Sequence, residues 1–491
     1  MIMKIRNIIK KYSVEIIILI FVAVILIKTL FISPIIGKCD NGDFGRLIIY
    51  GKLSNLSNDY KKMYDKFVHM YYLISSPKIF LIFYKDWVSE TILLKISVLI
   101  SLLAHGFSSN LFDIRYMAFV YSAIFILAMF LIMKFKRFST LLKVVLGIYI
   151  IMIFTDTSYI SYFNSFFGEA GTIVFFFLNI GTYLNLISKE KPKIRDFIYF
   201  FIASCSFLTS KAQELPLLVF MLIVYAGLYF YYKENKQRKC IIISSILVIT
   251  VCAASYLSLT NTMNRNNIYQ SVFLGVLIDS KNPEKDLQEL GLNKKFMVFY
   301  GQSFYNRHSG NDPLGKEMLT EFYPNVSPVK ILCFYLRHPT RFWQKVVESA
   351  NNAYAFSEPT KSNFLKGQYD PNKKVNTFRT RLVKRYINLY HNIYAYIFFS
   401  VAYFCIVIFY FKKNEDRSIR LLLLMLLFIL LSGASQFVLP VIGSGHGDFG
   451  KHLFLLNLTY DAMIGVSILW CFNVVSKLLC KKLIKRRSMN L

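Results

Sequence analysis

Apolar segments long enough to cross a bilayer recur along most of this chain. An α-helix rises about 1.5 Å per residue, so a run of about 20 apolar residues spans the hydrocarbon core. Segments of this kind lie at 14–32, 116–133, 142–154, 171–187, 198–208, 215–232, 241–257, 393–411, 421–439 and 453–472. A backbone in lipid must satisfy its own hydrogen bonds, as a helix does. The sequence therefore predicts an all-α polytopic membrane protein with about ten transmembrane helices.

The composition supports a membrane protein and argues against a nucleic-acid-binding protein. Hydrophobic residues make up 55% of the 491 residues, and aromatic residues 17%, which is unusual for soluble domains. The formal net charge of +30 comes from Lys and Arg residues that gather in short clusters between apolar segments. Such clusters suit anionic lipid head groups. We expect membrane lipids, and no nucleic acid, as partners.

The basic connectors predict the orientation of the chain. They lie at 134–143, 189–195, 233–239, 412–420 and 477–487. The positive-inside rule places them, and both termini, in the cytoplasm. The first apolar segment then acts as a signal anchor.

One further apolar run, 92–107, does not fit this pattern as a crossing helix. Counting it as a span would place Lys134, Lys136 and Arg137 outside. Lys95 and His105 also interrupt it, so we predict a juxtamembrane helix on the outer leaflet. The alternative is a true span that shifts the later topology.

Two long polar stretches divide the chain into three parts. Residues 1–259 form an N-terminal transmembrane module that includes a first outer loop, 34–112. Residues 260–389 hold most of the polar residues and prolines, and we expect them to form a small outer helical domain. Residues 390–491 supply the C-terminal transmembrane helices.

Polar residues also collect at the predicted outer ends of separate spans. They lie in the segments 40–46, 162–170, 210–216 and 445–452, each of which contains glycine or proline. A charged side chain costs about 2.5–3.5 kcal/mol at mid-depth on insertion scales, so charges near the hydrocarbon boundary indicate a functional role. Mixed acids and bases on one side of the membrane favour a substrate site.

Three acids are candidate catalytic residues. Asp43 is a candidate general base for an acceptor hydroxyl, and its alternative role is an Asx turn or helix cap. Asp40 is either a second carboxylate or the turn residue, and we favour the turn. Glu169 begins a helix, where capping and the helix dipole also favour a carboxylate.

Six further residues are candidates for substrate binding. Arg46 could hold Asp43 or bind a phosphate, and the alternative is an anchor to lipid head groups. Lys211, with Gln213 beside it, suits a phosphate, although snorkelling to the interface explains Lys211 equally well. The other three candidates are Asp448, Lys451 and His452. The spacing of His446, Asp448 and His452 is a weak metal signal, and we expect no metal or other cofactor.

Several stretches together resemble a known family of membrane enzymes. The Asp-bearing loop after the first span, the run 92–107 and the segment 111–115 are similar to the GT-C glycosyltransferases. Further similar stretches lie at 162–169, 269–277, 282–292 and 447–455. With these the chain resembles the WsfD-type hexose transferases of bacterial cell-surface glycan assembly.

The resemblance implies a fold and a reaction. It implies a GT-C-like helical fold and inverting transfer of a hexose from a polyprenyl-phosphate-linked donor to a glycan acceptor, on the outer face of the membrane. The family's base maps to Asp43 or Asp40, although this loop reads Asp-Asn-Gly-Asp instead of carrying two adjacent acids. Two other functions stay open. One is a transporter or flippase of polyprenyl-linked glycans, with Glu214 and Asp461 on its path, and the other is a non-catalytic cell-envelope assembly protein.

Overall fold

The structure is a computed structural model that describes residues 10–75, 85–305, 311–354, 361–370, 373, 375, 377–445 and 449–489. In this part of the chain, eight helical stretches are long and apolar enough to cross a membrane. They are α2 (Ser13–Leu30), α6 (Arg115–Met133), α9 (Glu169–Ile187), η3 with α11 (Ala212–Leu217, Leu218–Tyr231), α12 (Asn235–Leu257), α19 (Ile393–Lys413), α20 (Arg417–Ser435) and α23 (Phe454–Met489). The protein is therefore a helical multi-pass membrane protein.

Two of the ten predicted spans differ from a single long apolar helix. The segment 142–154 is part of a bent pair, in which Thr140–Phe154 and Thr157–Asn164 meet at 55°. Its elements are α7 (Thr140–Tyr149), η1 (Ile150–Phe154), α8 (Thr157–Ile160) and η2 (Ser161–Asn164). The segment 198–208 lies in α10 (Ile194–Leu208), which has only 15 residues. The described residues thus hold eight candidate spans, or nine with the bent pair.

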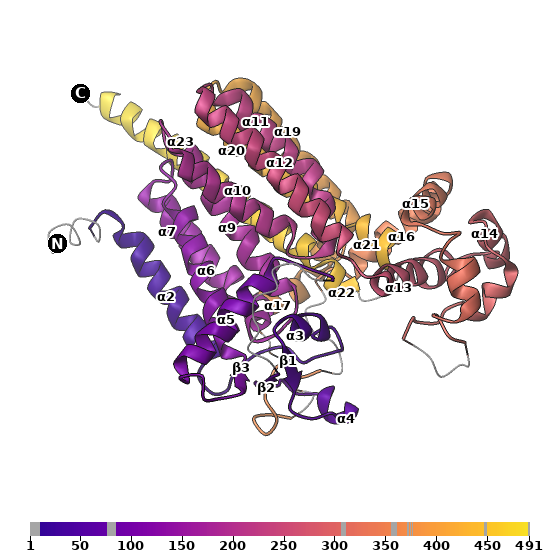
Figure 1. Cartoon of the computed structure of the whole chain (residues 1–491). Helices are drawn as coiled ribbons and strands as arrows, with labels where there is room; N and C mark the ends of the chain where they lie inside the picture. Colours follow the sequence, from indigo (N-terminus) through magenta and orange to yellow (C-terminus); the bar gives the residue numbers. More distant parts are fainter. Residues whose placement is uncertain are drawn as a thin grey trace.

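The basic connectors lie together at one end of the helices, the basic end. Arg137 pairs with Asp416 across two connectors at 2.6 Å. Arg417 donates to the carbonyl oxygen of Glu190, in a third connector, at 2.9 Å. Figure 1 shows the start of α2 and the end of α23 at this end, away from the three strands. The opposite end, the loop end, bears the long loops.

Helix α5 (Glu90–Ala104) covers most of the run 92–107. Tyr12, just before α2, packs its ring on Phe130 near the end of α6, with centroids 5.6 Å apart. Helices α2 and α6 therefore run in opposite directions, and the chain between them starts and finishes at the loop end. The prediction that this run adds no crossing is confirmed.

This topology predicts a labelling result. A cysteine introduced as Lys136→Cys should react with a membrane-impermeant thiol reagent only after the inner face of the membrane is exposed, because the positive-inside rule predicts a cytoplasmic location for its basic connector. The parent protein, with its native cysteines, is the control. Labelling of intact cells at position 136 would reverse the predicted orientation.

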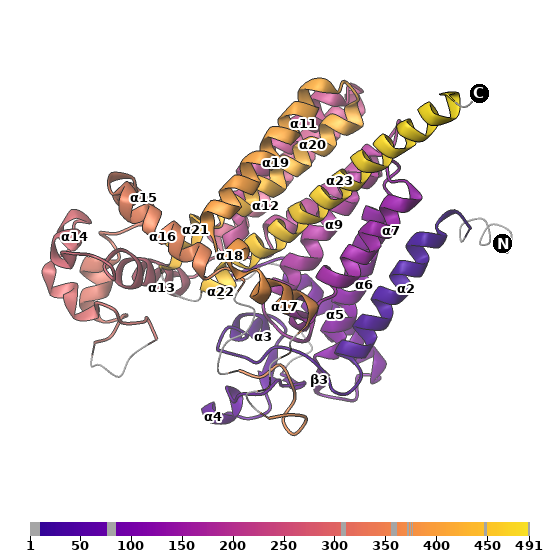
Figure 2. The ribbon, with the colours of Figure 1, turned by 180° about the vertical axis from the view of Figure 1, so that it is seen from behind.

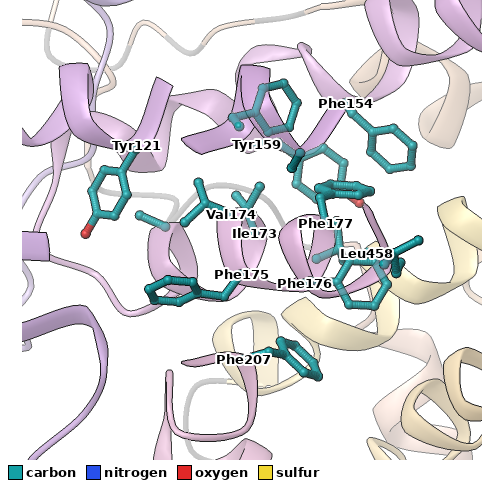
Figure 3. Close-up of a cluster of buried hydrophobic side chains, with 14 of the residues drawn as sticks. Tyr121, Phe154, Tyr159, Ile173, Val174, Phe175, Phe176, Phe177, Phe207 and Leu458 are labelled. Atoms are coloured by element: carbon teal, nitrogen blue, oxygen red, sulfur yellow. The ribbon is translucent and has the colours of Figure 1, made fainter. Parts of the chain in front are cut away.

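The core of the membrane part is built from aromatic side chains. Helix α9 runs through its centre, where Phe175, Phe176 and Phe177 are at most 5% exposed. Figure 3 shows these rings between α6, α10 and α23, with Tyr121, Phe207 and Leu458 around them. At a ring separation of 4.7 Å, Phe154 stacks edge to face on Phe177. This packing fixes the position of the first residue of α9, at the loop end.

A small sheet, which the all-α prediction did not include, lies at the loop end. Strands β1 (Leu53–Asn55), β2 (Tyr71–Ile74) and β3 (Leu111–Asp113) pair antiparallel in the order β1-β2-β3. Tyr and Ile residues favour strands, but runs of three or four residues are too short to show a strand period in the sequence. Helices α3 (Gly45–Tyr50) and α4 (Tyr60–Met63) complete the first loop region.

The second long region contributes to two places. Its first part is a helical lobe, defined as residues 261–305 and 311–351, with a hydrophobic core of its own that includes Phe273, Phe322 and Phe334. Figure 2 shows this lobe projecting beside the membrane helices. Its elements are α13 (Asn261–Ser271), η4 (Val272–Val276), α14 (Pro283–Glu289), η5 (Lys294–Phe299), η6 (Met318–Phe322), α15 (Pro328–Arg337) and α16 (Pro339–Asn351).

The second part packs against the rest of the protein. Asn363 and Gly37 exchange hydrogen bonds of 3.0 and 3.1 Å, which ties residues 361–370 to the first loop region. Arg379, in α17 (Phe378–Arg385), reaches Asp461 in α23 at 2.5 Å. The chain then passes through α18 (Ile387–Tyr390) into α19.

Two short helices connect α20 to α23, namely α21 (Leu439–Ser444) and α22 (Phe449–His452). The lobe contacts this connection closely. Ser271 donates to the carbonyl oxygen of Ile442 at 2.7 Å. A Cβ atom at Gly275 would lie 3.1 Å from the Cα of Gly445.

Candidate active site

The loop after α2 is shaped by Asp40. Its Oδ1 accepts hydrogen bonds from the backbone N–H of Gly42 at 2.8 Å and of Phe44 at 3.2 Å. Gly42 has a φ of +106°, which suits glycine. Burial raises the pKa of Asp40, against the effect of these two N–H groups. Asp40 is the turn residue of this loop, whereas the carboxylate of Asp43 contacts another part of the chain.

Phe44 holds the loop against the start of α9. Its side chain is 1% exposed. It packs edge to face on Phe166 and Phe167, with ring centroids 5.5 and 4.8 Å apart. Aromatic pairs of this kind contribute about 0.5–1.5 kcal/mol beyond their buried area. The contact places Asp43 beside the segment that leads into α9.

Asp43 forms an ion pair with Lys451 of α22. The ammonium group of Lys451 also lies 4.9 Å from the centre of the Phe167 ring. Burial acts to raise the pKa of Asp43, but Lys451, Arg46 and Lys211 together lower it. Its side chain remains 50% exposed. Asp43 is therefore an ionised carboxylate that stays accessible from outside the protein.

A second ion pair lies deeper, between Glu169 and Lys211. The Nζ of Lys211 is 2.8 Å from Oε1 of Glu169, and the two side chains are 19% and 3% exposed. Burial acts to lower the pKa of Lys211, but Glu169 and Glu214 raise it. Gly168 allows the close approach, because a Cβ atom there would lie 2.9 Å from Cγ of Lys211.

The two ion pairs belong to one site. Lys211 interacts electrostatically with Asp43, and Lys451 interacts with Glu169. Arg46 faces Asp43 as well, and its Nη2 lies 3.3 Å from the sulfur of Met263 in the lobe. The structure thus brings together Asp43, Glu169, Lys211, Lys451 and Arg46, which come from four separate parts of the chain.

Gln213 and His452 support this site. The Nε2 of Gln213 donates to the carbonyl oxygen of His452 at 2.6 Å, and Nδ1 of His452 lies 3.0 Å from Oε1 of Gln213. Gln213 also donates to Gln436 at 2.6 Å. These bonds fix the backbone next to Lys451. Two residues singled out in the sequence, Asp448 and His446, lie outside the described residues.

The charged side chains of this site form cation–carboxylate pairs. Within this part of the chain, His, Cys, Asp and Glu side chains form no group of three or more that could hold a metal ion. The arrangement can bind an anionic group through Lys211, Lys451 and Arg46, and it can accept a proton on Asp43.

Sequence reasoning missed Glu90, which lies beside this site. It begins α5 and is 0% exposed. Tyr121 donates a hydrogen bond to its Oε1, as does the N–H of Gly171 at 3.2 Å. An acid immediately before the apolar run 92–107 was the available signal.

The two acids proposed for a transport path have local partners. Asp461 accepts hydrogen bonds from Arg379 at 2.5 Å and from Tyr159 at 2.8 Å. Glu214 accepts one from Thr172 at 3.3 Å and lies near Lys211. Asp461 thus serves as an anchor for α17, and Glu214 borders the site at the loop end.

Comparison with solved structures gives two similar chains, both of archaeal origin. One is the oligosaccharyltransferase AglB from Archaeoglobus fulgidus in complex with an inhibitory peptide and a dolichol-phosphate, with a TM-score of 0.41, 13% identity and coverage of 96% of this chain and 52% of that one. The other is the Archaeoglobus fulgidus oligosaccharyltransferase tethered with an acceptor peptide, with a TM-score of 0.40, 13% identity and coverage of 94% and 50%. The chain spans about half the length of these two proteins.

Sequence comparison identifies relatives over most of the chain. The uncharacterized protein YfdI of Escherichia coli (strain K12) is 23% identical over 373 residues, which cover 73% of this chain and 76% of YfdI. Residues 3–490 match the family described as the YfdI N-terminal transmembrane domain. The chain therefore belongs to the YfdI N-terminal transmembrane domain family.

Proposed function

We propose that this protein is a membrane glycosyltransferase that moves a hexose from a polyprenyl-phosphate-linked donor to a glycan, at the outer face of a bacterial cytoplasmic membrane. The observation that carries the proposal is the meeting of Asp43, Glu169, Lys211 and Lys451 at the loop end. The resemblance to the WsfD-type hexose transferases supports the choice of a hexose.

The cations suit the head group of the donor. A lipid phosphate presents its charge at the membrane boundary, where Lys211 and Lys451 lie at the ends of membrane helices. Both lysines are paired with carboxylates in the free protein, so a bound phosphate competes for them. Arg46 adds a third cation, with a planar group that matches phosphate oxygens.

Asp43 is the proposed general base. The acceptor oxygen attacks the anomeric carbon on the face opposite the phosphate, and its proton passes to Asp43. The bond from that carbon to the phosphate oxygen breaks, and its electron pair leaves with the phosphate. When phosphate binds Lys451, this cation no longer lowers the pKa of Asp43 as strongly, so the carboxylate becomes a better base when the donor is present.

The test is a transfer assay. The purified protein in nanodiscs is mixed with polyprenyl-phosphate hexoses and a glycan acceptor, and the products are analysed by mass spectrometry with the anomeric configuration determined by NMR. An inverted glycosidic bond is the expected result. Movement of a lipid-linked glycan between leaflets without transfer would replace the enzyme by a flippase.

The cations give a prediction on donor binding. Lys451→Gln should weaken binding of undecaprenyl phosphate about 10- to 100-fold, because hydrogen bonds to charged groups contribute about 1.5–3 kcal/mol. Lys295→Gln is the matched control, since Lys295 lies on the lobe and pairs with Glu321 at 2.7 Å. Binding is measured by titration in nanodiscs. Equal affinity in both variants would remove Lys451 from the donor site.

A further inference from the structure

Glu90 connects three elements around the site. Both hydrogen bonds to its carboxyl group, from Tyr121 of α6 and from the N–H of Gly171 in α9, fall on Oε1. The other oxygen, Oε2, is buried without a hydrogen-bond partner among the described residues. Only one of the two carboxyl oxygens of Glu90 therefore accepts hydrogen bonds. The other oxygen, Oε2, is where a proton would reside.

The free oxygen faces the deep ion pair. A Cβ atom at Gly168 would lie 3.6 Å from Oε2 of Glu90 and 2.9 Å from Cγ of Lys211. One at Gly171 would lie 3.2 Å from Cβ of Glu90. The two glycines therefore let Glu90 and Lys211 pack against the first turn of α9 from two sides.

A neutral group among the neighbours of Lys211 would reduce the negative charge at the site. Lys211 faces three carboxyl groups, Glu90, Glu169 and Glu214. With all three ionised, two negative charges would be in excess where an anionic phosphate must bind. Burial, reinforced by the like charge of Glu169, raises the pKa of Glu90 to about 8.

Other titratable side chains lie on α3 and β3, which pack against α5, and on α5 itself. Arg46 of α3 contacts Met263, and Asp113 of β3 pairs with Arg115 at 2.5 Å. Tyr50 is the remaining titratable side chain of α3, and it is 9% exposed. Lys95 of α5 itself is one turn beyond Glu90, and burial lowers its pKa.

We propose that Glu90 is a positioning residue of this site, a neutral carboxylic acid that fixes the first turn of α9 and leaves the charge of Lys211 available to an anionic phosphate. The claim that Glu90 leaves Lys211 available to a phosphate rests on the proposed function. The claim that Glu90 is protonated does not rest on it.

The protonation of Glu90 in the folded protein is tested by the pH dependence of stability. The ordinary pKa of a glutamate is 4.5, and that of Glu90 in the folded protein is about 8. Between these two pH values, Glu90 is ionised in the unfolded chain and protonated in the folded protein. The stability from this group is complete below pH 4.5 and is lost as the pH rises to 8. Glu90→Gln has no such proton, so its Tm relative to wild type should rise through this interval and then level off.

The control for the melting curves is Glu284→Gln, at a glutamate on α14 whose side chain is 54% exposed. A constant Tm difference between Glu90→Gln and wild type from pH 5 to 9 would show that Glu90 is ionised in the folded protein. That result overturns the inference whether or not the protein transfers a sugar.

The effect of Glu90 on phosphate binding is tested by titrating undecaprenyl phosphate into the protein in phosphatidylcholine nanodiscs between pH 7 and 9.5. Wild-type affinity should fall about tenfold as Glu90 ionises, which corresponds to ~1 pKa unit of coupling, whereas Glu90→Gln should keep its affinity. The same pH dependence in both proteins would overturn the positioning role. If the wild type binds no undecaprenyl phosphate at any pH, the proposed donor is wrong and the positioning role falls with it, while the melting curves still decide the protonation state.

Discussion

Asp43→Asn is expected to lower sugar transfer by about 10²–10⁴-fold, the usual contribution of a general base. The amide keeps the size of the side chain but cannot accept the acceptor's proton. It also releases Lys451 from its ion pair, so binding of the lipid phosphate should persist or strengthen. Transfer rates from a polyprenyl-phosphate hexose, measured beside donor titrations, separate the two effects.

Asp40→Asn is the matched control for this result. Asp40 makes the turn through Oδ1 alone, which accepts from Gly42 and Phe44. An asparagine retains that acceptor, so transfer should stay within a few fold of wild type. An active Asp43→Asn variant would exclude Asp43 as the base, and an inactive Asp40→Asn variant beside it would assign the role to Asp40.

Arg379→Met is expected to lower the stability of the folded protein by about 3–5 kcal/mol, the usual effect of removing one partner of a buried ion pair. Arg379 is 1% exposed. It donates to Asp461 at 2.5 Å and to the hydroxyl of Tyr159 at 2.8 Å. Without it, Asp461 would be a buried carboxylate that has lost its cation. Thermal unfolding in detergent, followed by circular dichroism, measures the change.

The double variant Arg379→Met with Asp461→Leu provides the control. Replacing both charges by apolar side chains removes the unpaired carboxylate, so much of the lost stability should return. If the single variant melts at the wild-type temperature, Arg379 does not anchor α17 to α23.

The sequence predicts the membrane helices well because their signal is local. A long apolar run such as 14–32 or 393–411 must be a helix in lipid, whatever surrounds it. The segment 198–208 shows the limit of this reasoning. Its helix, α10, leads from the basic connector 189–195 to Lys211 at the loop end, with Phe200 and Phe201 packed beside Tyr225 of α11. With 15 residues it is shorter than the eight candidate spans, so length alone does not identify it as one.

The site is harder to predict because its contacts join distant parts of the chain. The charged segments at 40–46, 162–170 and 210–216 can be recognised as polar positions beside apolar runs. Their pairing cannot, since Asp43 and Lys451 are 408 residues apart. The roles of Glu90 and Arg379 were missed for the same reason, because the contacts that define them come from α6, α9 and α23.

The close contact between the lobe and the connection before α22 has a consequence for how this chain can vary among relatives. Gly445 has a φ of +59°, and a Cβ atom there would lie 2.6 Å from the carbonyl oxygen of Gln270. Any larger residue at position 445 would push the lobe away from the segment that carries Lys451. This contact therefore restricts the residues that evolution can place at both of its glycines, Gly275 and Gly445.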